Sequence, residues 1–135
     1  MILTDAGPLI ALVDKGDEAH SACTNALSRL TRPLVTTWPC VTEAMHLLNN
    51  AGGYFAQEVL WGYIGDGLVV IHQSDPEEQA RMRELMAKYK DTPMDLADAS
   101  LVAAAEVLGI RRIFTVDSDF IVYRLPGKQS FEIVP

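Results

Sequence analysis

The stretch LADASLVAAAEVLGIRRIFTVD, residues 96–117, decides how this chain folds. The segment 95–108 is apolar nearly all round, which indicates a helix that is buried on most of its sides. Gly109 fits the end of this helix, since glycine readily adopts the left-handed backbone found there. Residues 112–116 then read as a short buried strand, and Asp117 follows directly. A buried helix leading into a buried strand is the building unit of an α/β fold.

The rest of the chain alternates strand-like and helix-like runs in the same way. Strands are expected at residues 1–4, 34–37, 68–71, 112–116 and 131–134. Helices are expected at residues 9–13, 17–30, 39–50, 54–64, 76–90 and 95–108, with a break at Gly52-Gly53. This alternation predicts a three-layer α/β/α sandwich with a short, mostly parallel sheet, formed by one domain over residues 1–135.

Composition narrows the class of protein. The chain of 135 residues is 49% hydrophobic and 21% charged, which is typical of a globular domain. Its net charge of −7 argues against bulk electrostatic binding of nucleic acid, although not against hydrolysis of nucleic acid at a metal site. Cys23 and Cys40 form no disulfide framework and read as buried thiols. Without a leader pattern or an apolar run of ~20 residues, we expect a cytoplasmic protein with no membrane partner.

Some acidic residues lie in surroundings that disfavour them. Asp5 ends the apolar run 1–4, and Asp117 ends the run 113–116. Glu43 and Asp98 lie within apolar helical segments, and no lysine or arginine stands beside any of these four acids. Burying a carboxylate is costly unless it is paired or binds a metal, and hard divalent cations prefer oxygen ligands.

The predicted fold brings these acids toward one place. In a parallel sheet, sites form beyond the carboxyl ends of the strands, where the strand order switches. If the strands before Asp5 and Asp117 are neighbours, their ends lie about 5 Å apart. Asp98 arrives from the buried helix, with Asp95 three residues earlier on the same face. Glu43 lies near the start of its helix, which can also face this crevice.

Each acid also has an ordinary interpretation. Taken alone, Asp5 is typical of a helix cap, and Asp117 with its neighbours is typical of a turn. Asp95 suits the first turn of a helix, and Glu43 can extend to the surface. Asp98 resists such an interpretation, because the residues around it are apolar. The joint arrangement favours a metal site over these separate readings.

The chemistry that fits such a site is metal-assisted phosphodiester hydrolysis. Packed carboxylates repel one another, and one or two Mg²⁺ or Mn²⁺ ions would remove the conflict and activate water. His20, His46 and His72 are too scattered to form a catalytic set. The sequence has no glycine-rich phosphate loop and no serine nucleophile motif.

Several segments, in this order and spacing, resemble the PIN domain family, and more narrowly the VapC-type toxin ribonucleases of type II toxin–antitoxin systems. Residues 2–5 resemble the opening strand and first acid, and residues 41–43 resemble the second acidic position. Residues 96–102 and 114–120 resemble the two most distinctive motifs, which carry the remaining acids.

This resemblance implies a metal-dependent endoribonuclease acting as the toxin of such a pair. It implies Mg²⁺ or Mn²⁺, an RNA substrate, a homodimer and a cognate antitoxin. It also implies catalytic and metal-ligating roles for Asp5, Glu43, Asp98 and Asp117, with Asp119 able to replace or assist Asp117. Many relatives carry Ser or Thr after the first acid, where this chain has Ala6. Thr115 is a candidate to contact the ligands.

The cationic and aromatic residues give weaker indications of how RNA or a protein partner would bind. Arg124 and Lys128 flank the closing motif and are candidates for phosphate contacts. The basic residues within 81–90 are interleaved with glutamates, which favours a solvated helix face. Five aromatic residues fall on or beside the two middle helices, where core packing is the default and an exposed subset would form a dimer or antitoxin surface: Trp38, Tyr54, Phe55, Trp61 and Tyr63.

Two other functions compete with the ribonuclease. The first is a catalytically silent PIN-fold interaction module, whose signature would be missing acids, and none is missing here. The second is a phosphatase or phospho-acceptor that uses a carboxylate after the first strand. The phosphatase pattern places a second aspartate two residues after the first, and Gly7 occupies that position.

Overall fold

The computed structural model describes all 135 residues, and a five-stranded parallel sheet runs through its centre. The strands are β1 (Ile2–Thr4), β2 (Leu34–Thr37), β3 (Val69–His72), β4 (Arg112–Phe114) and β7 (Glu132–Val134). They lie in the order β3-β2-β1-β4-β7, so the chain builds outward from β1 in both directions. Leu3 of β1 pairs with Val35 on one side and with Ile113 on the other. The switch in strand order therefore lies between β1 and β4, where α/β sheets form their binding crevices.

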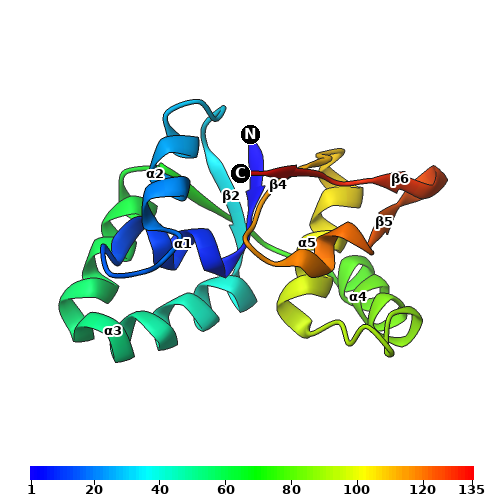
Figure 1. The fold of residues 1–135 in the computed structure, drawn as a ribbon. Coiled ribbons are helices and arrows are strands. Elements are labelled where there is room, and N and C mark those ends of the chain that lie inside the picture. The colour runs from blue at the N-terminus through cyan, green and yellow to red at the C-terminus, as the bar shows by residue number, and fades with distance from the viewer.

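Helices cover both faces of the sheet (Figure 1). On one side lie α1 (Ala6–Val13), α2 (His20–Leu27) and α3 (Trp38–Gly65). On the other side lie α4 (Pro76–Lys88) and α5 (Leu96–Leu108). This is the expected α/β/α sandwich. None of these helices combines the length and apolarity that crossing a lipid bilayer requires.

The helix α5 is the buried element that the sequence predicts. Every residue from Ala97 to Ala105 is buried, because α5 packs between the sheet and α4. The small alanines let the helix lie close to both neighbours. Gly109 ends α5 in the left-handed conformation, with φ of 67°. The interior is continuous, since a single cluster of 31 buried residues joins both helical layers to the sheet.

Several boundaries differ from those expected. The two predicted middle helices form one element, α3, which bends sharply at Gly53, where φ is 66° and ψ is −157°. The first helix begins at Ala6 rather than at residue 9, because Asp5 caps it and Pro8 is tolerated in its first turn. The strand expected at 112–116 ends at Phe114. Beyond it, Thr115 and Val116 lead the chain out of the sheet toward Asp117.

The segment between β4 and β7 contains structure that the sequence patterns did not predict. It holds two short 3₁₀ turns, η1 (Ser118–Ile121) and η2 (Pro126–Lys128), and a small antiparallel hairpin of β5 (Arg124–Leu125) and β6 (Gln129–Ser130). The two-residue strands are too short to show a period of alternation. Aromatic packing orders this segment, because Phe120 stacks edge-to-face on both Tyr123 and Phe131.

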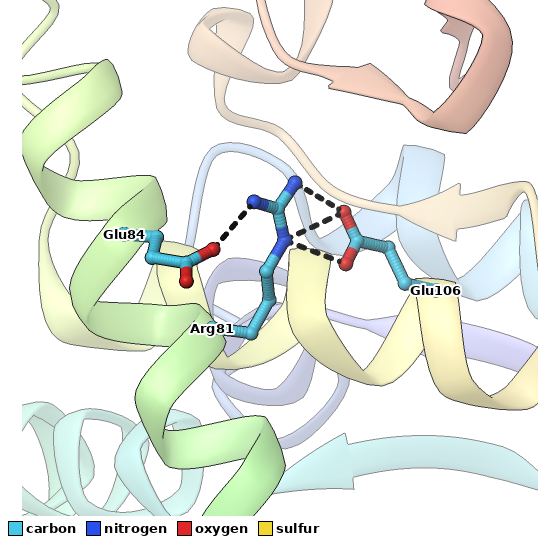
Figure 2. Close-up of polar contacts among 3 residues, drawn as sticks. All are labelled: Arg81, Glu84 and Glu106. Atoms are coloured by element: carbon cyan, nitrogen blue, oxygen red, sulfur yellow. Dashed lines mark hydrogen bonds and ion pairs between the residues drawn. The ribbon is translucent and has the colours of Figure 1, made fainter.

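An ion pair joins the two helices on the α5 side of the sheet. Arg81 of α4 donates from Nε and Nη2 to the carboxylate of Glu106 on α5, with distances of 2.9 Å, and from Nη1 to Glu84 at 3.1 Å (Figure 2). The expectation of a merely solvated face is wrong for Arg81. Its fork-shaped guanidinium suits this two-pronged contact, which fixes α4 against α5.

Gly7 is required by a close approach between α1 and the chain beyond β4. A Cβ added at position 7 would lie 2.6 Å from Cγ2 of Val116. Valine is branched at Cβ and turns aside only at a cost, so the contact would displace the backbone that carries Asp117. The sequence places a glycine here for space rather than for a turn, since Gly7 lies inside α1.

We predict that Gly7→Ala destabilises the protein by about 1–3 kcal/mol, the usual cost of overpacking. Val116→Ala removes the obstructing methyl groups, so the double variant should recover the lost stability. Urea denaturation of the wild type, both single variants and the double variant measures this coupling. Additive effects of the two substitutions would contradict the steric explanation.

Candidate metal centre

Three aspartates meet at the switch point of the sheet. Asp5 follows β1 directly, Asp117 stands shortly after β4, and Asp98 lies in the first turn of α5. Each offers a carboxylate oxygen within 4.8 Å of the others. The convergence that the sequence predicts is therefore present. It arises because β1 and β4 are hydrogen-bonded neighbours and α5 starts at the same edge of the sheet.

Asp5 is held by donors on two sides. Its side chain is 7% exposed. Oδ1 accepts a hydrogen bond from the Ala6 backbone N–H at 2.8 Å, as in a helix cap. Oδ2 accepts one from the Thr115 hydroxyl at 2.9 Å, and the same hydroxyl oxygen accepts from the Asp117 backbone N–H at 3.0 Å. Thr115 thus makes the contact expected of it and links two of the aspartates.

Asp98 is held by a residue that sequence reasoning missed. The Tyr123 hydroxyl donates to Oδ2 of Asp98 at 2.8 Å. Tyr123 is fully buried, and its ring packs edge-to-face against Tyr89 and Phe120. Because this tyrosine follows an irregular turn, no periodicity pointed to it. Asp98 itself is 5% exposed, and its backbone N–H donates to Oδ1 of Asp95, which caps α5.

The aspartates line a pocket of about 410 Å³. Its lining residues are Asp5, Gly7, Glu43, Asp95, Asp98, Val116, Asp117 and Ser118. Glu43 reaches it from the second turn of α3 and is exposed, so it stands at the rim rather than among the buried acids. Asp119 does not line the pocket. Its backbone N–H instead donates to Oδ1 of Asp117 at 2.9 Å.

The electrostatics of the pocket are unfavourable without a cation. Burial raises the pKa of Asp98 to about 7, well above its ordinary value. The Tyr123 hydrogen bond opposes this rise, and the charges of neighbouring aspartates add to it. Burial also raises the pKa of Asp5 and of Glu43, and nearby carboxylates add to both shifts. No lysine or arginine forms an ion pair with any of these acids. The pocket therefore offers only oxygen ligands and no positive side chain, which is the set of groups that suits a hard divalent cation.

Similarity to known proteins agrees with this geometry. The model of the PIN domain family matches residues 2–125. The chain belongs to the PIN domain family. Ribonuclease VapC26 of Mycobacterium tuberculosis is 24% identical to it over 135 residues, which cover 99% of this chain and 100% of the relative. The resemblance to the family noted from the motifs is thus confirmed.

Two solved structures share the fold. The crystal structure of Mycobacterium tuberculosis VapC20, a toxin that cleaves the sarcin–ricin loop, matches with a TM-score of 0.81 and 18% identity, over 88% of this chain and 92% of that one. A chain of a toxin–antitoxin complex from Klebsiella pneumoniae matches with a TM-score of 0.71 and 20% identity, over 100% of this chain and 97% of that one. The PIN-like architecture expected from the sequence is therefore the one observed.

Ionised Asp98 should lower the stability of the metal-free protein. Its folded-state pKa of about 7 lies above the ordinary value of 3.8, so the penalty is absent below about pH 4, grows as the pH rises between these values, and is complete above pH 7. Asp98→Asn keeps an acceptor for Tyr123 but carries no charge.

We predict that, in a chelator, Asp98→Asn is more stable than the wild type at pH 8, on the order of 1–3 kcal/mol after allowing for solvent in the pocket. The gain should shrink as the pH falls to 5. Thermal denaturation across this range provides the measurement. A gain that is equal at both pH values would show that the charge of Asp98 is not responsible.

Proposed function

We propose that this protein is a metal-dependent endoribonuclease that hydrolyses RNA phosphodiester bonds, and that it acts as the toxin of a VapBC-type toxin–antitoxin pair. The observation that carries the proposal is the convergence of three aspartates that lack any neighbouring cation. The full-length similarity to a VapC ribonuclease supports it. All four acids that the family motif requires are present, which disfavours a catalytically silent interaction module.

Asp5, Asp98 and Asp117 would hold Mg²⁺ or Mn²⁺, with Glu43 at the rim, and Asp119 is a further candidate. The bound ion would polarise the phosphate and lower the pKa of a water molecule. The chain's own residues orient the ligands. Thr115 fixes Asp5, and Tyr123 fixes Asp98 through Oδ2 and leaves Oδ1 without a protein donor.

The two basic side chains that flank the closing motif give the substrate little help. Arg124, a candidate for phosphate contacts, donates from Nη1 to the backbone carbonyl groups of Ile121, Val122 and Tyr123. These contacts occupy it in stabilising η1. Lys128 is exposed but does not line the acidic pocket. Attraction to the bound metal and contacts to the bases would therefore carry most of the affinity for RNA.

A cognate antitoxin and a homodimer are part of the proposal, as is a cytoplasmic location. Tyr63 is partly buried and packs against the core, as expected by default for these aromatic residues. The other aromatic residues of α3 form the exposed subset. Tyr54 and Phe55 are 64% and 79% exposed and stack edge-to-face on each other just beyond the bend of α3. Exposed aromatic side chains of this kind are enriched at protein interfaces.

We predict metal-dependent cleavage of a defined RNA panel by the wild type in Mg²⁺ or Mn²⁺. Asp98→Ala should reduce the rate at least ~100-fold, because it removes a ligand of the ion that stabilises the developing charge. Asp66→Asn is the matched control, since this exposed aspartate at the end of α3 lies outside the pocket. Folded, metal-binding wild type that leaves every RNA intact would overturn the proposal.

We also predict that Asp117→Asn weakens the binding of Mn²⁺ more than Asp119→Asn, by roughly tenfold, since only Asp117 directs an oxygen to the other two aspartates. Calorimetric titration of each variant with Mn²⁺ measures the difference. If Asp119→Asn has the larger effect, the carboxylate of Asp119 must rotate into the pocket when the ion binds. A titration with no heat for the wild type would favour the interaction module.

A further inference from the structure

A second pocket lies beside the acidic one, at the carboxyl ends of β2 and β3. It measures about 210 Å³. Its lining residues are Thr37, Trp38, Pro39, His72, Ser74, Glu78, Gln79, Met82, Leu96 and Ser100. A third, shallow depression lies between the two pockets. It shares the lining residues Glu43 and Asp95 with the acidic pocket, and Trp38 and Leu96 with the second pocket. The three depressions therefore adjoin one another along the carboxyl edge of the sheet, and we refer to them together as the groove.

The mouth of the second pocket is apolar and exposed. Trp38 is the first residue of α3 and is 43% exposed, although core packing was the default expectation for it. Leu96 is the first residue of α5 and is 53% exposed. Met82 of α4 lies deeper and is buried. A planar ligand can stack on the indole ring between these side chains, as unpaired bases do on aromatic residues.

The polar wall of the pocket has an acceptor that no protein donor occupies. Glu78 is only 5% exposed. Its Oε2 lies 2.8 Å from Nε2 of His72, whereas its Oε1 has no hydrogen-bond partner. The nearby Ser100 hydroxyl donates to the carbonyl of Ala97, and it shares a 2.6 Å hydrogen bond with Thr37. The protein thus satisfies these hydroxyl groups itself. It leaves Oε1 of Glu78 free of any protein donor and not fully enclosed, so a donor on a ligand can reach this oxygen.

We propose that this pocket binds a guanine base of the RNA strand, with a neighbouring phosphate of that strand at the acidic pocket. The inference rests on the proposed ribonuclease function. Guanine presents two adjacent donors on its Watson–Crick edge, the ring N–H and the exocyclic amino group. Oε1 of Glu78 can accept one of them, and the second lone pair of Oε2, which already contacts His72, can accept the other. Uracil has one ring N–H between two carbonyl oxygens, which the carboxylate repels. Glu78 then reads the base and Trp38 stacks on it.

Nucleosides carry no phosphate, so their binding depends neither on a metal ion in the acidic pocket nor on repulsion by the negative charge of the protein. The chain has two tryptophans, so Trp61→Phe assigns the indole N–H signal of Trp38 in an NMR titration. In EDTA, guanosine should shift the Trp38 signal saturably. Inosine, which lacks the amino group, should bind roughly tenfold more weakly, since a hydrogen bond to a charged acceptor is lost. Uridine should bind more weakly still.

Glu78→Gln should abolish the preference for guanosine over inosine, while the matched variant Glu77→Gln on the same helical turn should keep it. In RNA cleavage, Glu78→Gln should likewise remove a preference for guanine beside the cleaved bond. Equal shifts from all three nucleosides, or no shift from any, would overturn the guanine pocket even if RNA is cleaved. The latter result would leave an apolar peptide as the occupant. Guanosine binding without any cleavage of RNA would overturn the nuclease proposal instead.

Discussion

Repulsion among three clustered carboxylates, two buried and one half-buried, is the constraint on which the rest of this structure depends. Asp5, Asp98 and Asp117 offer oxygens within 4.8 Å of one another, and no basic side chain offsets their charge. A fold can keep such an arrangement only if its scaffold is rigid. That rigidity comes from the hydrogen-bonded pair β1 and β4 and from the buried helix α5. The polar donors Thr115 and Tyr123 fix the carboxylates without neutralising them.

The two helical layers contribute different things to the groove. Through α1 and α3 the first layer supplies the cap at Asp5, the rim acid Glu43 and the exposed Trp38. The second layer supplies Asp98 from α5 and Glu78 from α4, and the Arg81–Glu106 ion pair holds these two helices in register. The groove therefore crosses from one layer to the other, as expected of a site at the carboxyl edge of a parallel sheet.

A net charge of −7 is compatible with a groove that has one pocket for a metal ion and one for a base. A protein that binds nucleic acid through its phosphates alone needs many lysines and arginines. This groove instead combines an acidic pocket suited to a metal ion with an apolar pocket suited to a base. The affinity for RNA would then come from a few specific contacts, which is compatible with an acidic surface.

The sequence by itself determined the α/β class, the buried helix ending at Gly109 and the acids after the first and fourth strands. These features depend on local periodicity and on residue type, which a single chain displays directly. The resemblance of residues 114–120 to the closing motif of the family also made Thr115 a candidate contact, which the structure bears out. Only the tertiary structure decided that Tyr123 contacts Asp98, that Gly7 makes room for Val116, and that Arg81 pairs with Glu106. Only the tertiary structure also decided that Asp119 lies outside the pocket. Such contacts join residues that are distant in sequence or separated by irregular turns, so no repeating pattern encodes them.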